Sequence, residues 1–234
     1  HQLKAALDKT MLAASSDETR PVLGGVYFHT ADGKLFIAAT DGYRLAETEV
    51  AEVKGEVAAI VPTAALQDTL RILQDDQEGQ VTLRFDEGQF GVSFGGTNLV
   101  SRLTEGQYPE YRQLIPETSE VQASISRAEL LTAAKLAGLF ARESGGSITL
   151  KASEADKTLT VSSVASQVGD NSSAISGDVT GSGDVVVNVR YLTDALNCFD
   201  SQTINFRFSG SISPCVLSSE DQAGYQHIVM PLKS

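Results

Sequence analysis

The chain has little cysteine and no long apolar run. Cys198 and Cys215 are the only cysteines among 234 residues. Two cysteines cannot build a disulfide framework or a zinc cage, so we expect reduced, partly buried thiols in a cytoplasmic protein. No apolar stretch approaches the ~18 residues of a membrane-spanning helix, and no signal-peptide pattern is recognisable. These absences disfavour disulfide-rich secreted proteins and helical membrane proteins.

Positive charge is also scarce. The 18 Lys and Arg residues are outnumbered by 30 Asp and Glu residues, which gives a formal net charge of −12. A nucleic-acid-binding protein usually has the opposite balance, and an acidic excess by itself indicates solubility. If nucleic acid is a partner, it must contact a local basic surface within an acidic whole.

Motifs of enzyme chemistry are missing as well. The three histidines are too dispersed to predict a metal site: His1, His29 and His227. Asp41 has no His, Lys or second carboxylate beside it, and Asp-Gly is typical of a hairpin turn. The glycine-rich segments 144–147 and 180–183 are neither P-loops nor dinucleotide fingerprints, and no serine lies in a nucleophile elbow. We therefore expect neither a catalytic residue nor a cofactor nor a bound metal.

What the sequence does contain is a repeat. Residues 2–116 have the pattern of helix, strands, helix, strands, and the same order recurs over 126–231 with different residues. A duplicated module of roughly a hundred residues indicates an architecture of stacked copies. We predict an α+β fold with two similar domains, 1–117 and 118–234, each with two helices packed on antiparallel sheets.

Helix and strand signals support this organisation. Apolar spacing predicts a helix over 2–14, and start signals place three more at Pro62-Thr63, Ser126 and Asn188. We expect the third helix to end at Gly145-Gly146. Short alternating segments predict strands over 25–30, 35–40, 43–50, 81–85, 90–94, 99–103, 148–152, 159–163, 204–208, 215–218 and 225–230. Segment 107–118, with two prolines, is expected to be an extended linker, and loops are expected to be frequent over 169–183.

Several apolar residues stand where exposure is expected. Tyr43 and Leu45 follow a hairpin turn, segment 108–111 lies in the linker, and the chain ends in the apolar run 228–232. One interpretation of the terminal run is a core strand. The other is an apolar groove between the domains that accepts a short peptide from a partner.

Four segments carry a family resemblance. Residues 17–23, 39–46, 105–111 and 225–233 resemble the bacterial sliding clamps, the β subunits of DNA polymerase III. The segments follow the order and spacing of that family and cover both halves of the chain.

The resemblance implies an incomplete ring. Clamp protomers have three similar domains, and this chain resembles the second and third only. Two full-length protomers form a ring around duplex DNA through the first domain of one and the third of the other. By this resemblance Leu139 and Phe140 would contact the neighbour's first domain, although an amphipathic helix core would explain them equally well. We expect this chain to be a monomer and the full-length protein a homodimer.

The resemblance also implies contact between the helices and DNA. Cations on the helix patterns and one loop would meet phosphates loosely, without reading sequence. The alternative for each is a solvated helix face. The candidates are Lys4, Lys9, Arg20, Arg71, Arg127, Lys135 and Arg190.

A peptide-binding cleft between the two domains is the second implied site. It would tether the α subunit of DNA polymerase III, clamp-loader subunits and other clamp-motif proteins through short segments containing Gln, Leu and Phe. The residues carried over are Leu23, Thr40, Gly42, Tyr43, Arg44, Leu45, Pro109, Leu114, Tyr191, Ile212, Pro214, Ile228, Val229, Met230, Pro231 and Leu232. Gln113 and Gly145 depart from the family pattern at the rim of this cleft.

Two other hypotheses remain open at this point. One is a two-domain α+β enzyme with an interdomain active site, which a perturbed carboxylate or a metal would support. The other is an extracellular all-β recognition module, which secretion and a disulfide between Cys198 and Cys215 would support.

Overall fold

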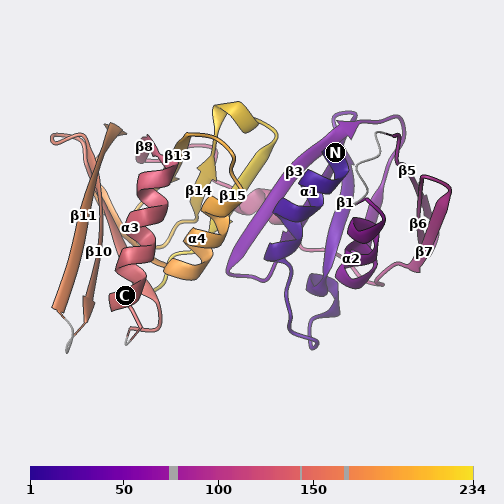
Figure 1. Cartoon of the computed structure of the whole chain (residues 1–234), viewed down its shortest axis with the longest axis horizontal. Helices are drawn as coiled ribbons and strands as arrows, with labels where there is room; N and C mark the ends of the chain where they lie inside the picture. Colours follow the sequence, from indigo (N-terminus) through magenta and orange to yellow (C-terminus); the bar gives the residue numbers. More distant parts are fainter. Residues whose placement is uncertain (74–78, 143, 166–168, 234) are drawn as a thin grey trace. The chain divides into compact units, whose positions relative to one another are not determined.

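The computed structural model describes residues 1–73, 79–142, 144–165 and 169–233. The chain forms two compact units, His1–Pro109 and Glu110–Ser234. Each unit combines α-helices with antiparallel strands, as Figure 1 shows, and this confirms the predicted α+β class. The division between the units falls inside segment 107–118. That segment is not simply extended, because it contains a 3-10 helix (η3, Tyr111–Leu114) in which Tyr111 is buried.

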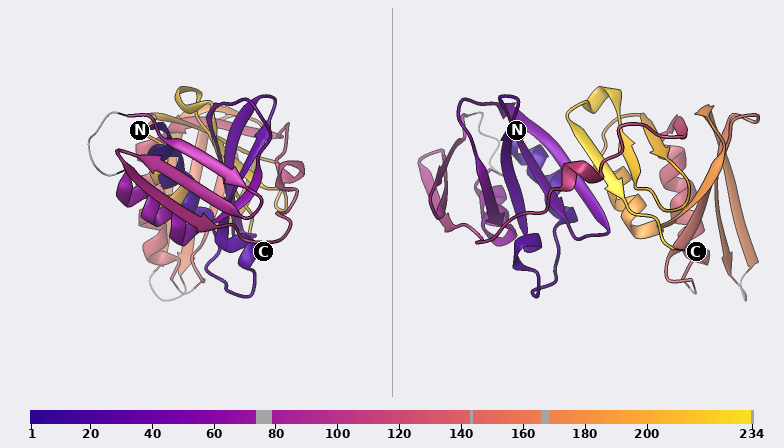
Figure 2. Two further views of the ribbon diagram at one scale, coloured as in Figure 1. Left: turned by 90° about the vertical axis from the view of Figure 1, so that its right-hand side faces the viewer. Right: turned by 180° about the vertical axis from the view of Figure 1, so that it is seen from behind.

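The described residues of the first unit form two antiparallel sheets and two α-helices. Its larger sheet has the strand order β3-β2-β1-β4 and its smaller sheet the order β5-β6-β7. The left view of Figure 2 faces the smaller sheet. The elements are α1 (Gln2–Thr10), η1 (Met11–Ala13), η2 (Pro21–Gly24), β1 (Gly25–Ala31), β2 (Lys34–Thr40), β3 (Arg44–Glu52), β4 (Ala58–Pro62), α2 (Thr63–Ile72), β5 (Thr82–Asp86), β6 (Gln89–Phe94) and β7 (Thr97–Arg102).

Local chemistry explains how this unit folds. Leu3 and Leu7 form the buried stripe of α1, as the helical spacing predicts. Asp32 and Gly33 turn the chain between β1 and β2 with φ values of 50° and 76°, the positive pair that a two-residue hairpin needs. Phe28 joins the core of the larger sheet to the smaller one, since its ring centroid lies 5.7 Å from that of Phe90 on β6.

The described strands of the second unit form an antiparallel sheet in the order β12-β9-β10-β11-β8-β13-β14-β15. Its elements are η3, β8 (Val121–Ser126), α3 (Arg127–Phe140), β9 (Ser147–Ser153), β10 (Thr158–Ala165), β11 (Gly169–Thr180), β12 (Gly183–Asn188), α4 (Val189–Asn197), β13 (Thr203–Phe208), β14 (Cys215–Ser218), η4 (Glu220–Gln222) and β15 (Tyr225–Val229). The predicted caps are present: the Ser126 side chain accepts a hydrogen bond from the backbone N–H of Glu129, and that of Asn188 accepts one from Arg190.

The sequence interpretation was wrong at one long segment. Residues 169–180, where loops were expected to be frequent, form the continuous strand β11, which pairs with β10 on one side and with β8 on the other. Only Ile175 and Val179 of this strand are buried, so composition alone suggested loops. The ladder on both sides outweighs the low strand propensity of the small polar residues. Strands β4, β8 and β12 were also missed, and α3 ends at Phe140, before the predicted glycines.

The cysteines do not support a secreted module. Cys198 and Cys215 both lie within the described residues, are buried and are not joined by a disulfide, and burial raises the pKa of the Cys215 thiol to about 12. The disulfide that the extracellular hypothesis needs is therefore not formed. None of the helices in the described part of the chain combines the length and the apolar character that a bilayer crossing requires.

Candidate functional site

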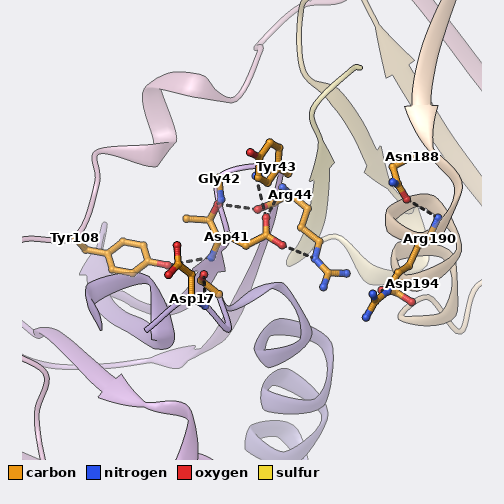
Figure 3. A network of polar contacts seen from close by, with 11 residues as sticks. Asp17, Asp41, Gly42, Tyr43, Arg44, Tyr108, Asn188, Arg190 and Asp194 are labelled. Atoms are coloured by element: carbon orange, nitrogen blue, oxygen red, sulfur yellow. Dashed lines mark hydrogen bonds and ion pairs between the residues drawn. The ribbon is translucent and has the colours of Figure 1, made fainter. Parts of the chain in front are cut away.

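The turn between β2 and β3, residues 40–45, is closed by its own side chains. Asp41 Oδ1 accepts hydrogen bonds from the backbone N–H groups of Tyr43 (2.9 Å) and Arg44 (3.0 Å). The Thr40 hydroxyl accepts one from Gly42 N–H (3.1 Å) and donates to the Arg44 carbonyl oxygen (2.7 Å). Gly42 has a φ of 92°, a conformation that favours glycine. Figure 3 shows this network, and it confirms that Asp41 is a turn residue.

An ion pair fixes the arginine of the 40–45 turn. Arg44 Nε lies 3.1 Å from Asp41 Oδ2, and the two side chains are only 9% and 16% exposed. Such a shielded, hydrogen-bonded pair is screened little by salt. Tyr43, between the two, is 63% exposed. The turn therefore presents an aromatic ring to solvent beside a guanidinium group of fixed position.

A residue from the end of the unit braces the same turn. The hydroxyl of Tyr108 accepts a hydrogen bond from Thr40 N–H (3.0 Å), and its ring stacks on that of Tyr27 at a centroid distance of 4.9 Å. Tyr108 is buried, and burial raises the pKa of its phenol. Leu23 and Leu45 are buried, whereas Pro109 is exposed. The first unit thus holds the predicted residues 40–45 in one rigid loop.

In the second unit the predicted residues belong to the terminal run 228–232 and to earlier segments of the sequence. Ile228 and Val229 are buried in β15, and the three residues that follow are half-buried. The backbone N–H of Leu232 donates to the Val186 carbonyl oxygen (2.8 Å) and so ties the terminal segment to β12. Ile212 is 78% exposed and Leu114 is 63% exposed. Tyr191 and Pro214 are half-buried.

The predicted DNA-facing cations differ in how they are held. Arg20 and Lys135 are exposed, whereas Lys4 and Lys9 are half-buried on α1. Arg71 pairs with Asp68 on the exposed surface of α2 (2.6 Å), and Arg190 lies 4.0 Å from Asp194 on α4.

Arg127 has a structural task. Its Nε donates to the carbonyl oxygen of Ser201 (3.0 Å) and its Nη1 to that of Leu196 (3.3 Å). The guanidinium therefore links the last turn of α4, through Leu196, to the loop that follows this helix, through Ser201. Of the seven predicted DNA-facing cations, Arg127 is the one for which contact with DNA has the least support.

Helix α3 exposes apolar side chains at its C-terminal half. Leu136 is 41% exposed and Leu139 is 60% exposed, whereas Phe140 is half-buried. The core of the helix is formed by Leu130, Ala134 and Ala137, all fully buried. Leu139 is thus not a core residue; its role at a ring interface stays a prediction.

Two of the three histidines, His29 and His227, have structural neighbours. His29 Nε2 lies 3.9 Å from Glu47 Oε2, and His227 Nδ1 lies 2.9 Å from the Tyr225 hydroxyl. In the part of the chain that the structure describes, no group of three or more His, Cys, Asp or Glu side chains is placed to hold a metal ion.

Sequence reasoning found the 40–45 turn but not what supports it. The Asp41-Gly42 pair signalled the turn, and helical periodicity signalled the buried face of α3, which Leu130, Ala134 and Ala137 form. The Tyr108 hydroxyl left no signal, because its partner Thr40 is 68 residues away in the sequence.

Comparison of the fold with known structures defines a class. The chain matches the structure of the DNA polymerase III beta subunit from Thermotoga maritima with a TM-score of 0.93 and 26% identity, over 99% of this chain and 63% of that one. The C. crescentus beta sliding clamp gives 0.92 and 26%, over 100% and 63%, and its structure holds polyethylene glycol at its proposed beta-motif tethering region. The fold is that of a DNA sliding clamp.

The family follows from the sequence. The family model for the central domain of the DNA polymerase III beta subunit matches residues 1–110, and that for its C-terminal domain matches residues 112–233. The chain belongs to the DNA polymerase III beta-subunit family. It is 30% identical to the beta sliding clamp of Staphylococcus aureus over 99% of its own length. It spans 62% of the length of that relative.

Proposed function

We propose that this chain comprises the middle and C-terminal domains (1–117 and 118–234) of a cytoplasmic, non-catalytic processivity factor for DNA polymerase III. The observation that carries the proposal is the match of two successive domains of the beta-subunit family, in order, to the two halves of the chain. A clamp encircles duplex DNA and tethers the polymerase and other replication and repair proteins. Closing the ring would also need the family's first domain, so we propose that this chain alone is a monomer.

The tether would be a cleft to which both units contribute. The 40–45 turn offers the exposed ring of Tyr43 and the fixed guanidinium of Arg44. The second unit offers the terminal run 228–232 with exposed Ile212. Apolar and aromatic surfaces of this kind suit leucine and phenylalanine anchors, and Met230 can adapt its shape to them. Arg44 can donate hydrogen bonds to peptide carbonyl groups.

The chemistry of tethering needs no reacting group. Binding a polymerase segment to a ring on the same DNA raises the effective concentration of the polymerase at the primer end. The exposed cations Arg20 and Lys135 support loose contact with phosphates, which allows sliding because phosphate contacts carry no sequence information.

The proposal is tested by titrating a labelled peptide with a Gln-Leu-Phe core into the chain. We expect Tyr43→Ala and Met230→Ala each to weaken binding about tenfold, the typical loss for a buried apolar anchor. The matched control is Val100→Ala on β7, because Val100 is exposed (67%) and apolar but lies outside the proposed cleft. Unchanged binding in both cleft variants would reject the assignment of the cleft.

A further inference from the structure

Strand β2 loses its neighbour on one side before it reaches the 40–45 turn. Its register with β1 ends at Ala38. Backbone N–H groups of adjacent residues in a strand point to opposite sides. Asp41 N–H bonds the carbonyl oxygen of Arg44 in β3, so Thr40 N–H points away from β3. On that side, beyond the last residue of β2 that pairs with β1, the Thr40 N–H donates to the Tyr108 hydroxyl at 3.0 Å.

Thr40 links this bond to the rest of the turn. Its hydroxyl accepts from Gly42 N–H and donates to the carbonyl oxygen of Arg44. A shift of the Thr40 backbone would therefore move the residues on either side of exposed Tyr43. Thr40 is itself buried. If the Tyr108 hydroxyl were removed, the Thr40 N–H group could not bond to bulk water instead unless the turn opened.

The ring of Tyr108 is held independently of its hydroxyl. It stacks on Tyr27 with an interplanar angle of 9°, and Tyr27 in turn stacks on His29 at 4.9 Å. Tyr108 is only 5% exposed. Burial, and to a smaller extent the nearby Asp41 carboxylate, raise the pKa of the phenol, so it stays neutral at physiological pH.

We propose that the Tyr108 hydroxyl is a positioning group for the 40–45 turn, and that by holding Thr40 it sets the affinity of the peptide site. This inference rests on the proposed function, because it concerns the residues that would bind the peptide. Tyr108 itself acts through Thr40 and need not touch the peptide.

The test compares Tyr108→Phe with Tyr27→Phe in the whole chain. Tyr108→Phe removes the acceptor and keeps the stacked ring, whereas Tyr27→Phe removes a hydroxyl from the neighbouring ring of the same stack. Two quantities are measured: the dissociation constant of the Gln-Leu-Phe peptide, and the amide hydrogen-exchange rate of Thr40 by NMR. In Tyr108→Phe we expect Thr40 to exchange at least tenfold faster and the peptide to bind about tenfold more weakly, a change of about 1.4 kcal/mol. Tyr27→Phe should change neither quantity.

The amide data separate positioning from general stability. A local role predicts faster exchange at Thr40 and Gly42 with unchanged exchange at buried Phe28 in the core of the same unit. An equal rise in the exchange rates of Thr40, Gly42 and Phe28 would overturn the proposal. Unchanged exchange at Thr40 would also overturn it, and so would faster exchange at Thr40 with unchanged peptide affinity. If the wild-type chain does not bind the peptide at all, the proposed function is wrong, and the exchange rate of Thr40 still decides whether the hydroxyl holds the turn.

Discussion

Replacing Asp41 by asparagine should destabilise the first unit, although the new side chain has the same shape. The amide oxygen of asparagine can still accept from the N–H groups of Tyr43 and Arg44. The amide nitrogen, however, would face Arg44 Nε where the carboxylate oxygen now lies 3.1 Å away, and two donors cannot bond each other. The substitution therefore removes one charge-assisted bond, and with it the negative charge of the Asp41 carboxylate beside a shielded guanidinium.

The size of this effect follows from burial. A hydrogen bond to a charged group contributes about 1.5–3 kcal/mol, and removing one partner of a fully buried pair costs about 3–5 kcal/mol. The Asp41–Arg44 pair is 9% and 16% exposed, so we expect a loss of about 2 kcal/mol in the free energy of unfolding of the first unit. Loosening the turn should also weaken binding of the Gln-Leu-Phe peptide.

The chain offers a matched control for this variant. Asp68 and Arg71 form a pair with the same three-residue spacing on α2, at 2.6 Å, but their side chains are 54% and 73% exposed. Exposed pairs contribute about 0–1 kcal/mol, so Asp68→Asn should be nearly neutral. The two units can unfold in separate transitions, so the free energy is best measured from amide exchange of Phe28 in the core of the first unit. Equal stability of Asp41→Asn and Asp68→Asn would refute the reasoning.

Four further predictions concern other parts of the molecule. Arg127→Ala should lower the stability of the second unit by about 2 kcal/mol, because its guanidinium bonds the end of α4. Lys135 is exposed, so Lys135→Ala should leave stability unchanged and reduce the salt dependence of DNA binding. A stability loss in Lys135→Ala together with a reduced salt dependence in Arg127→Ala would show that the two roles are assigned the wrong way round. The free energy of unfolding should fall as pH rises from about 9 towards 12, because burial raises the pKa of Cys215 from 9.0 to about 12 and the thiol therefore ionises first in the unfolded chain. In Cys215→Ala, the free energy of unfolding from urea titrations should fall less steeply with pH. In sedimentation the chain should be a monomer, whereas a version that carries the family's first domain should be a dimer that Leu139→Asp dissociates; a stable dimer of this chain alone would contradict the interface argument.

Periodicity and caps predicted most of the helices and many of the strands. Helix starts at Ser126 and Asn188 were predictable because a short polar side chain satisfies free N–H groups at a helix start. Strand β11 was not predictable, because what places its polar residues in a sheet is pairing on both edges with β10 and β8. Such pairing is a property of the tertiary structure and leaves no local pattern.

The candidate site shows the same division. Asp41 and Gly42 carry a local turn signal, so the 40–45 turn was expected. Its brace by Tyr108 depends on a contact across 68 residues, and the task of Arg127 depends on carbonyl groups 69 and 74 residues away. A single sequence contains no signal for such contacts, so the residues of the candidate site were easier to name than the residues that hold them in place.

The most direct test of the central claim is an NMR titration of the isotopically labelled chain with the Gln-Leu-Phe peptide. The account predicts that amide signals of the 40–45 turn and of residues 228–230 shift together, with one dissociation constant, because residues of both units bind the same peptide. Shifts limited to one of these segments, or two segments that saturate at different peptide concentrations, would contradict it.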